Sequence, residues 1–167
     1  ADGYIVAPGF IDPHSHALSG LTARKAPQPL LNYLTQGVTT LVIGNDGGGP
    51  ADIAAQHQRI DALSVGPNVA TFVGHNAVRE TVIGLENRKP SASELDELRA
   101  LIDQAMQDGA LGLSAGLYYP PSVYAETAEI TELARVAARH GGLYESHIRD
   151  ESSYTIGLLA AIDEALT

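Results

Sequence analysis

The sequence predicts an α/β protein built on a parallel sheet. Short strand-like segments alternate with amphipathic helical segments, and five such units follow one another at spacings of about 30 to 40 residues. Polar side chains follow the strand ends, where parallel α/β folds place their sites. Two architectures fit the 167 residues. The chain matches the first five units of a (β/α)8 TIM barrel, and it also matches an open five-stranded doubly wound sheet.

The first unit begins with an apolar segment at residues 5–7 and, after a bend, continues as an extended run at residues 10–12. This run leads into His14 and His16. Alternate residues of a strand share a face, so we expect both imidazoles to point the same way. Two converging imidazoles are suitable ligands for a divalent transition metal. The alternative interpretation is two unrelated polar residues in a turn.

The second unit follows a loop predicted at residues 17–27 and a short helix predicted at residues 29–34. Residues 38–43 form a continuous, largely β-branched run, which is typical of a strand buried on both faces. Asp46 follows this strand and is close to three consecutive glycines. A carboxylate in this position is either a further ligand or an ordinary turn residue.

The third unit contains a helix predicted at residues 51–63 and a strand predicted at residues 69–73. His75 follows the strand, and we expect it to be a hydrogen-bonded structural histidine. Residues 77–92 show no clear period and are predicted to be a long connection. Within it, residues 79–89 are either a lid over the site or a solvated loop.

The fourth unit begins with the strongest helical signal in the chain. Ser91 and Glu94 match a capping box, and an apolar stripe continues from them to a stop at Gly109. Residues 110–114 are predicted to be a short strand. The fifth unit then follows.

The fifth unit contains a helix predicted at residues 127–139 and a strand predicted at residues 143–148. Glu145 and His147 lie two residues apart on this strand and therefore share a face. A last helix is predicted at residues 154–166, where apolar residues recur at helical spacing.

The composition excludes several classes of protein. The formal net charge is −10, which argues against a nucleic-acid or anionic-membrane surface. The chain has no cysteine, so a metal site must use histidine, carboxylate or water ligands. No apolar run approaches the roughly 20 residues of a membrane span, and no signal peptide is present. We therefore expect a cytoplasmic protein without a membrane partner, whose natural N-terminus lies upstream.

Five motifs carry a resemblance to a known family, and they occur in order along nearly the whole chain: GFIDPHSH, GVTTLVIGNDG, FVGHNAVR, GALGLSAGLYYPP and YESHIRDES. Together they resemble the amidohydrolase superfamily and, within it, the N-acyl-D-amino-acid deacylases. The resemblance implies a metal-dependent hydrolase on a (β/α)8 barrel with a small β-domain. Members of the family are longer. Residues 1–167 are therefore expected to be a partial catalytic barrel with strands 1 to 5, without the β-domain and strands 6 to 8.

The resemblance also implies roles for individual residues. His14 and His16 match the ligand pair of the first strand, and His147 matches the ligand of the fifth strand. Tyr119 matches a tyrosine that contacts the substrate carboxylate. Where the family has a metal-binding cysteine after Gly-Asn, this sequence has Asp46, a harder ligand that suits zinc or manganese.

Two further residues are candidates because of their positions beside His147. Glu145 could bridge two metal ions in place of the carboxylated lysine that many superfamily members carry on strand 4, where this chain offers Ser114. Arg149 could pair with a substrate carboxylate, which suits its planar guanidinium group. The alternative is a structural ion pair between Glu145 and Arg149. The cofactor implied is a divalent metal, zinc before others, as one or two ions.

The function implied is deacylation of N-acyl-D-amino acids by a metal-activated water. The general-base aspartate is expected in the missing part, so the chain alone is expected to be inactive. Its partners are then a small N-acyl amino acid and the remainder of its own barrel. One alternative is a dipeptidase or a cyclic-amide hydrolase of the dihydroorotase or hydantoinase kind. The other is a non-catalytic α/β binding domain.

Overall fold

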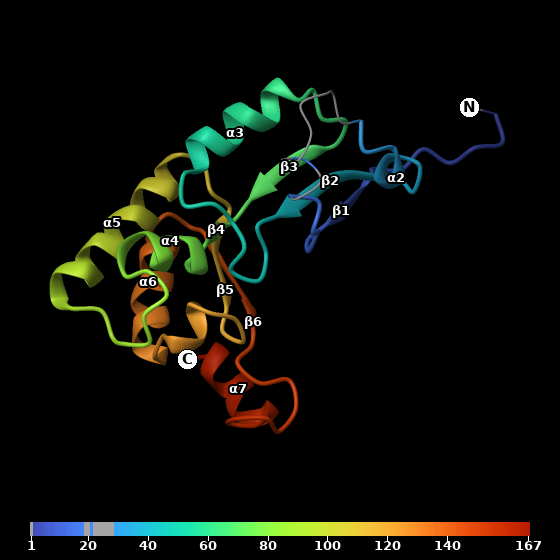
Figure 1. The fold of residues 1–167 in the computed structure, drawn as a ribbon. Helices are drawn as coiled ribbons and strands as arrows, with labels where there is room; N and C mark the ends of the chain where they lie inside the picture. The colour runs from blue at the N-terminus through green and yellow to red at the C-terminus, as the bar shows by residue number, and fades with distance from the viewer. Residues whose placement is uncertain (1, 19–20, 22–28) are drawn as a thin grey trace.

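A computed structural model describes residues 2–18, 21 and 29–167, so most of the predicted loop at residues 17–27 lies outside the described residues. The elements alternate between strands and helices along the chain (Figure 1). They are β1 (Phe10–Asp12), α2 (Leu31–Leu34), β2 (Val38–Ile43), α3 (Ile53–Ala62), β3 (Asn68–Thr71), β4 (Val73–Gly74), α4 (His75–Val82), α5 (Ala92–Gln107), β5 (Gly112–Gly116), a 3-10 helix (Ser122–Tyr124), α6 (Thr127–Arg139), β6 (Leu143–His147) and α7 (Leu158–Ala165).

All paired strands are parallel and follow their order in the sequence. One sheet has the order β1-β2-β3 and the other has the order β4-β5-β6. β3 and β4 are two parts of one strand interrupted at Phe72, whose N–H donates to the carbonyl of Ile43 at 2.9 Å. On the other side, the N–H of Leu111 donates to the carbonyl of Thr71 at 2.8 Å. The chain therefore contributes five consecutive parallel strands.

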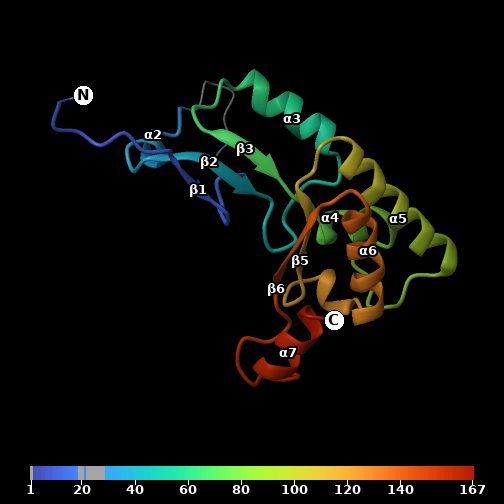
Figure 2. The ribbon, with the colours of Figure 1, turned by 180° about the vertical axis from the view of Figure 1, so that it is seen from behind.

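The sequential strand order distinguishes between the two predicted architectures. A doubly wound sheet reverses its order at a switch point and carries helices on both faces. Here every strand is next to its predecessor, and α3, α5 and α6 lie on the same side of the strands in both views (Figures 1 and 2). This is the winding of a (β/α)8 barrel. The open doubly wound alternative is wrong.

The main core fills the space between the second half of the sheet and its helices. Strand residues Val73 and Leu113 are fully buried against Leu98 and Ile102 of α5 and Leu133 of α6. These helical positions recur at the spacing that places them on one face. The core fixes the strands to the helices and leaves the carboxyl ends of the strands to carry polar side chains.

Several predicted elements are confirmed. The strand predicted at residues 38–43 and the helix predicted at residues 127–139 have those bounds in the structure. Helix α5 begins with the predicted capping box, in which the Ser91 side chain accepts from the N–H of Glu94 and the Glu94 carboxylate accepts from the N–H of Ser91. Among the described residues, no helix is long and apolar enough to cross a membrane.

The predicted connection at residues 77–92 is wrong in its first part, because α4 begins at His75 and continues to Val82. Arg79, at the start of the segment considered as a lid, is fully buried within this helix. The buried residues of this helix are His75, Val78 and Arg79, and two of these three are polar types that a hydrophobic pattern does not register. The buried side chain makes α4 part of the scaffold and excludes Arg79 from a lid.

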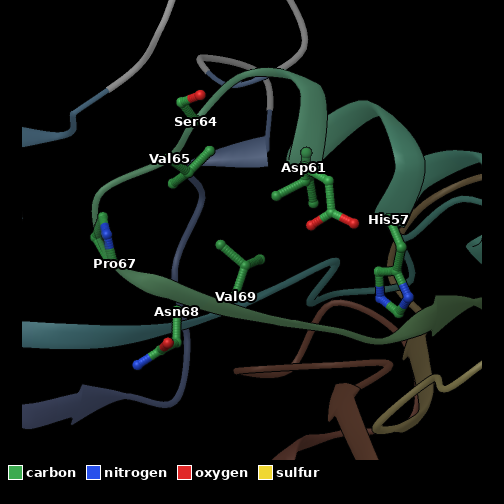
Figure 3. A pocket seen from close by; sticks show the side chains of 8 residues that line it. His57, Asp61, Ser64, Val65, Pro67, Asn68 and Val69 are labelled. Carbon is green, nitrogen blue, oxygen red and sulfur yellow. The ribbon is translucent and has the colours of Figure 1, made fainter.

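A cavity of about 490 Å³ lies between α3 and the start of β3, with His57, Asp61 and Asn68 among its lining residues (Figure 3). It lies at the amino end of β3. Catalytic residues of parallel barrels lie at the opposite, carboxyl ends of the strands, and residues at the amino ends contribute to stability. We therefore associate this cavity with the scaffold.

Candidate metal centre

Polar side chains from three separate strands meet at the carboxyl ends of the sheet. His14 and His16 follow β1, Asp46 follows β2, and Glu145 and His147 are at the end of β6. The register of parallel strands places these ends at the same edge of the sheet. The winding of the sheet therefore brings residues from both ends of the chain together.

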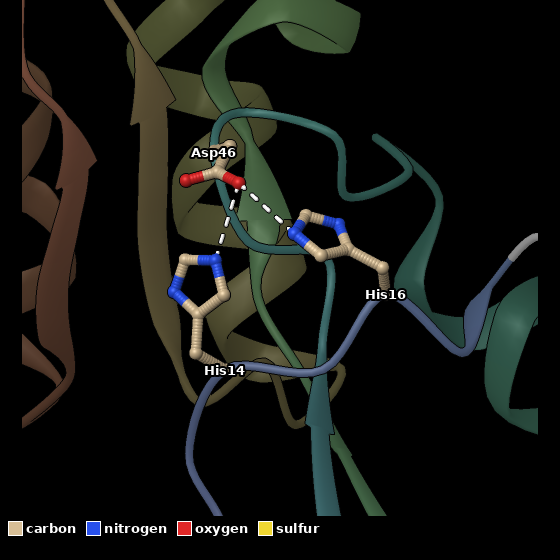
Figure 4. Close-up of side chains that lie close together, drawn as sticks. All are labelled: His14, His16 and Asp46. Carbon is tan, nitrogen blue, oxygen red and sulfur yellow. Dashed lines mark hydrogen bonds and ion pairs between the residues drawn. The ribbon is translucent and has the colours of Figure 1, made fainter.

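Asp46 lies at the centre of this group (Figure 4). Its Oδ2 atom is 3.2 Å from Nε2 of His14 and 3.4 Å from Nε2 of His16. The two imidazole rings are 5.2 Å apart between centroids. As predicted from their alternation in the sequence, both histidines point toward the same place, and they do so from the loop that follows a strand of only three residues.

The donor set fits a divalent metal. One ligand atom from each of His14, His16 and Asp46 lies within 4.8 Å of the other two. Two imidazoles and one carboxylate are ligands that zinc accepts in proteins, and a fourth position then remains for water or substrate. The His16 side chain is 73% exposed, so the group is open on one side to a ligand from solvent.

Glu145 and His147 border the same group from β6. The N–H of Asp46 donates to Oε2 of Glu145 at 2.9 Å, and Oε1 of Glu145 is 3.6 Å from Nδ1 of His14. Nδ1 of His147 is 3.8 Å from Oδ1 of Asp46. Burial raises the pKa of the Glu145 carboxyl, and this effect outweighs the opposite effect of the hydrogen bond from Asp46.

The loop that carries Asp46 is held by Ser114 of β5, a residue for which the sequence predicted no role. The hydroxyl of Ser114 donates to the carbonyl of Gly44 at 2.5 Å and accepts from the N–H of Gly47 at 3.2 Å. Asp46 and Gly47 have φ values of 56° and 74°. A Cβ atom at Gly47 would lie 2.4 Å from Oδ1 of Asn76, so the turn requires glycine at this position.

Two tyrosines cover His147. The ring of Tyr119 is 4.8 Å from the His147 ring and that of Tyr118 is 5.8 Å from it, measured between centroids. Tyr119 is 43% exposed, so one part of its surface packs against the histidine and another part faces solvent. This position beside the group is compatible with the predicted contact to a ligand.

Arg149 does not have the predicted position. Its Nε and Nη2 atoms donate to the Glu164 carboxylate at 2.8 Å each. Nη1 donates to the carbonyl of Val123 and Nη2 to that of Ala125, both at 2.9 Å. The guanidinium therefore ties the loop before α6 to α7, instead of pairing with a substrate carboxylate or with Glu145. The position of Arg149 is set by its ion pair with Glu164, a partner 15 residues further along the chain.

A sequentially wound parallel sheet with histidines and carboxylates at its carboxyl ends defines an α/β barrel of the class that builds metal sites from strand ends. The comparison with known proteins finds relatives that match nearly the whole chain. A D-aminoacylase from Alcaligenes xylosoxydans xylosoxydans is 36% identical over an alignment that covers 97% of this chain and 37% of the relative. An N-acyl-D-glutamate deacylase from the same organism is 37% identical, covering 99% and 37% of the two chains.

Solved structures give the same relationship. A D-aminoacylase crystal structure matches with a TM-score of 0.81 and 32% identity over 94% of this chain and 37% of the other. The N-acyl-D-glutamate deacylase of Bordetella bronchiseptica, in complex with zinc and a phosphonate inhibitor, matches with a TM-score of 0.83 and 34% identity over 95% and 37%. No family model matches the chain.

The chain is therefore homologous, over nearly its whole length, to the N-acyl-D-amino-acid deacylases of the amidohydrolase superfamily. It spans about 37% of the length of the curated relatives that it matches.

Proposed function

We propose that this chain provides the metal-binding part of an enzyme that hydrolyses the amide bond of N-acyl-D-amino acids. The observation that carries the proposal is the convergence of His14, His16 and Asp46, whose ligand atoms lie within 4.8 Å of one another. The homology to deacylases supports the reaction type. The convergence of these three side chains supports the binding of a divalent metal.

The proposed ligands are His14, His16, His147, Asp46 and Glu145, for one or two divalent ions. Zinc is the first choice because imidazole and carboxylate suit it, and because the related Bordetella structure contains zinc. A bound zinc ion supplies a Lewis acid that polarises an amide carbonyl and lowers the pKa of water. These residues would hold the ion at the carboxyl ends of the strands, and the Glu145 carboxylate fixes the Asp46 backbone by accepting its N–H.

The proposed substrate contact is Tyr119. Its ring packs on His147, so a molecule in contact with the Tyr119 hydroxyl lies next to the proposed ligands. The carboxylate of an N-acyl amino acid can accept a hydrogen bond from a phenol. We propose that the general base is an aspartate outside these 167 residues, and that the remainder of the barrel is a partner of this chain.

The metal is tested on the chain itself by isothermal titration with zinc chloride. We expect saturable binding of one or two ions, and we expect the double variant His14→Ala, His16→Ala to lose it. The variant His140→Gln is a suitable control, because His140 lies at the end of α6 and pairs with Asp103 instead of the site. Equal zinc binding by wild type and the double variant would contradict the proposed ligands.

The reaction is tested with the zinc-loaded full-length protein on N-acetyl-D-amino acids, their L enantiomers, dipeptides and hydantoins. We expect release of acetate from the D enantiomers, with loss of turnover after chelation. Turnover of dipeptides or hydantoins alone would favour the dipeptidase or cyclic-amide alternative. Lack of turnover of every substrate, together with absence of zinc binding, would favour a non-catalytic binding domain.

A further inference from the structure

A cluster of buried polar side chains lies beside the proposed metal centre and is not explained by it. His75, Arg79 and Ser122 are fully buried, and Glu129 is 6% exposed. Nε2 of His75 lies 3.0 Å from Oε1 of Glu129, and Nδ1 lies 2.5 Å from Oγ of Ser122. Nη1 of Arg79 donates to both carboxylate oxygens of Glu129 at 2.7 Å. The cluster joins β4 and α4 to the region before and within α6.

The charges of the cluster can be assigned from its contacts. Burial lowers the pKa of His75, so the imidazole is neutral at pH 7. Burial alone would raise the pKa of Glu129, but the hydrogen bonds from His75 and Arg79 outweigh it and the carboxyl is ionised. A carboxylate accepts from an N–H, which places the imidazole proton on Nε2. The Ser122 hydroxyl lies 2.5 Å from Nδ1 of His75 and donates to Oδ1 of Asn76, so Ser122 contacts both residues.

The cluster contacts the middle of the loop that carries Tyr119. We call residues 117–126 the tyrosine loop. The backbone bonds of Tyr119 are local: its N–H donates to the carbonyl of Gly116 at the end of β5 and its carbonyl accepts from the N–H of Val123, both at 2.9 Å. Ser122 anchors the loop to His75. Nδ2 of the neighbouring Asn76 donates to the carbonyl of Pro120 at 3.3 Å.

Arg149, in the segment after β6, contacts the same loop. Its guanidinium donates to the carbonyls of Val123 and Ala125, directly after the residue that contacts His75. The side chain is 14% exposed and is itself fixed by Glu164 of α7. The tyrosine loop is therefore held between a side chain at the end of β4 and a side chain in the segment after β6.

We propose that His75 and Arg149 are positioning residues, which hold the tyrosine loop so that the Tyr119 ring stays against His147 and meets the substrate. The inference rests on the proposed function for its substrate and on the structure for its contacts. Replacing a buried ion pair by apolar residues is often neutral or stabilising. The polar groups of this cluster are therefore explained better by the defined loop geometry that they impose than by stability.

The first test measures hydrogen–deuterium exchange in the full-length protein. Ser122→Ala removes the loop side of the contact and leaves His75, Arg79 and Glu129 in place. Arg149→Lys keeps the charge but loses the planar fork. For each variant that retains its helical circular dichroism, we expect amide exchange in the tyrosine loop to become at least about tenfold faster, with β2 unchanged. His140→Gln is the control and should match wild type.

The second test compares kinetic constants of the full-length protein on N-acetyl-D-amino acids. For Ser122→Ala we expect KM to rise about tenfold, kcat to change less than about threefold, and zinc affinity to stay at the wild-type value. Unchanged loop exchange in both variants would overturn the inference, whatever the turnover. Faster exchange with unchanged KM would overturn it as well. Absence of turnover in wild type would instead refute the proposed function, and the exchange data would still decide whether the loop is held.

Discussion

The carboxylate of Asp46 and the imidazole of His14 lie 3.2 Å apart, although 32 residues separate them in the sequence. His14 follows β1 and Asp46 follows β2. The parallel pairing of β1 with β2 brings the ends of the two strands together. A carboxylate and a histidine at this distance either form an ion pair or share a cation. The second histidine on the same oxygen favours the shared cation, because one carboxylate oxygen seldom needs two imidazole donors.

Replacing the carboxylate should separate these two explanations. We expect Asp46→Ala to lower zinc affinity by at least about 100-fold, because even residues in contact with ligands change affinity by roughly 10- to 100-fold. Isothermal titration calorimetry of the chain measures the zinc affinity. The control is Asp61→Asn, an exposed carboxylate on α3. If Asp46→Ala binds zinc as tightly as wild type does, Asp46 is an ordinary turn residue.

Zinc should also stabilise the folded chain. At a free concentration of 100 times the dissociation constant, a ligand that binds only the native state adds about 2.7 kcal/mol. For a chain of this length we expect an increase in Tm of roughly 5 to 10 °C, reversed by a chelator. Differential scanning calorimetry with and without zinc measures this increase in Tm. The double variant His14→Ala, His16→Ala should show no increase, and an equal increase in that variant would place the zinc elsewhere.

The hydroxyl of Ser114 should be required for the stability of the loop that carries Asp46. Ser114→Ala leaves the carbonyl of Gly44 and the N–H of Gly47 without this buried partner. We expect the free energy of unfolding to fall by about 1 to 3 kcal/mol, measured by urea denaturation. Ser93→Ala, at an exposed position of α5, provides the comparison. A loss no larger than that of Ser93→Ala would contradict the role of Ser114.

Asp150 should make the stability of the segment before α7 dependent on pH. Its fully buried carboxylate accepts hydrogen bonds from the N–H groups of Ser152, Tyr154, Thr155 and Gly157 and from the hydroxyl of Thr155. Burial raises the pKa of this carboxyl, but the backbone hydrogen bonds outweigh it, and its pKa lies well below the usual range.

A lowered pKa in the folded state adds stability at pH values above the unfolded pKa of about 3.9. This contribution is lost as pH falls through the folded pKa. We therefore expect Asp150→Asn to lower the Tm at pH 7 by roughly 5 °C or more, and the difference from wild type to shrink as the pH falls below about 4. Thermal unfolding monitored by circular dichroism at several pH values measures both. Asp163→Asn on α7 serves as the control, and a difference that does not change with pH would exclude the carboxylate as its cause.

Elements with strong periodicity could be predicted from the sequence. The largely β-branched run at residues 38–43 and the apolar stripe at residues 127–139 gave the bounds of β2 and α6. The capping box at Ser91 gave the start of α5. In these segments local preference and tertiary burial agree, so a single sequence contains the information.

Helix α4 could not be predicted in the same way. It begins at His75 directly after β4, and its N-cap is Gly74, which has no side chain for a cap. Its buried residues include His75 and Arg79, polar types that a hydrophobic pattern does not count. Their burial depends on Glu129, more than 45 residues further along the chain. That partner is defined only by the folded structure.

The candidate site could be predicted in part. The spacing of His14 and His16 predicted that they point the same way, whereas Asp46 was left open as a ligand or a turn residue; the structure brings the three together. Arg149 was misjudged because its position after a strand resembles that of a site residue, whereas its Glu164 partner lies on the following helix. A partner that lies many residues away cannot be recognised in the sequence, and its charge alone does not identify it.

The hydrogen bond from Asp46 to Glu145 joins residues 99 positions apart. The entropic cost of closing a segment grows with its length, and contacts of high sequence separation slow the folding of a chain. We therefore expect the proposed metal centre to form late in folding, because it is complete only after β6 has joined the sheet. In a stopped-flow refolding experiment, the capture of zinc should therefore lag behind the formation of helical structure.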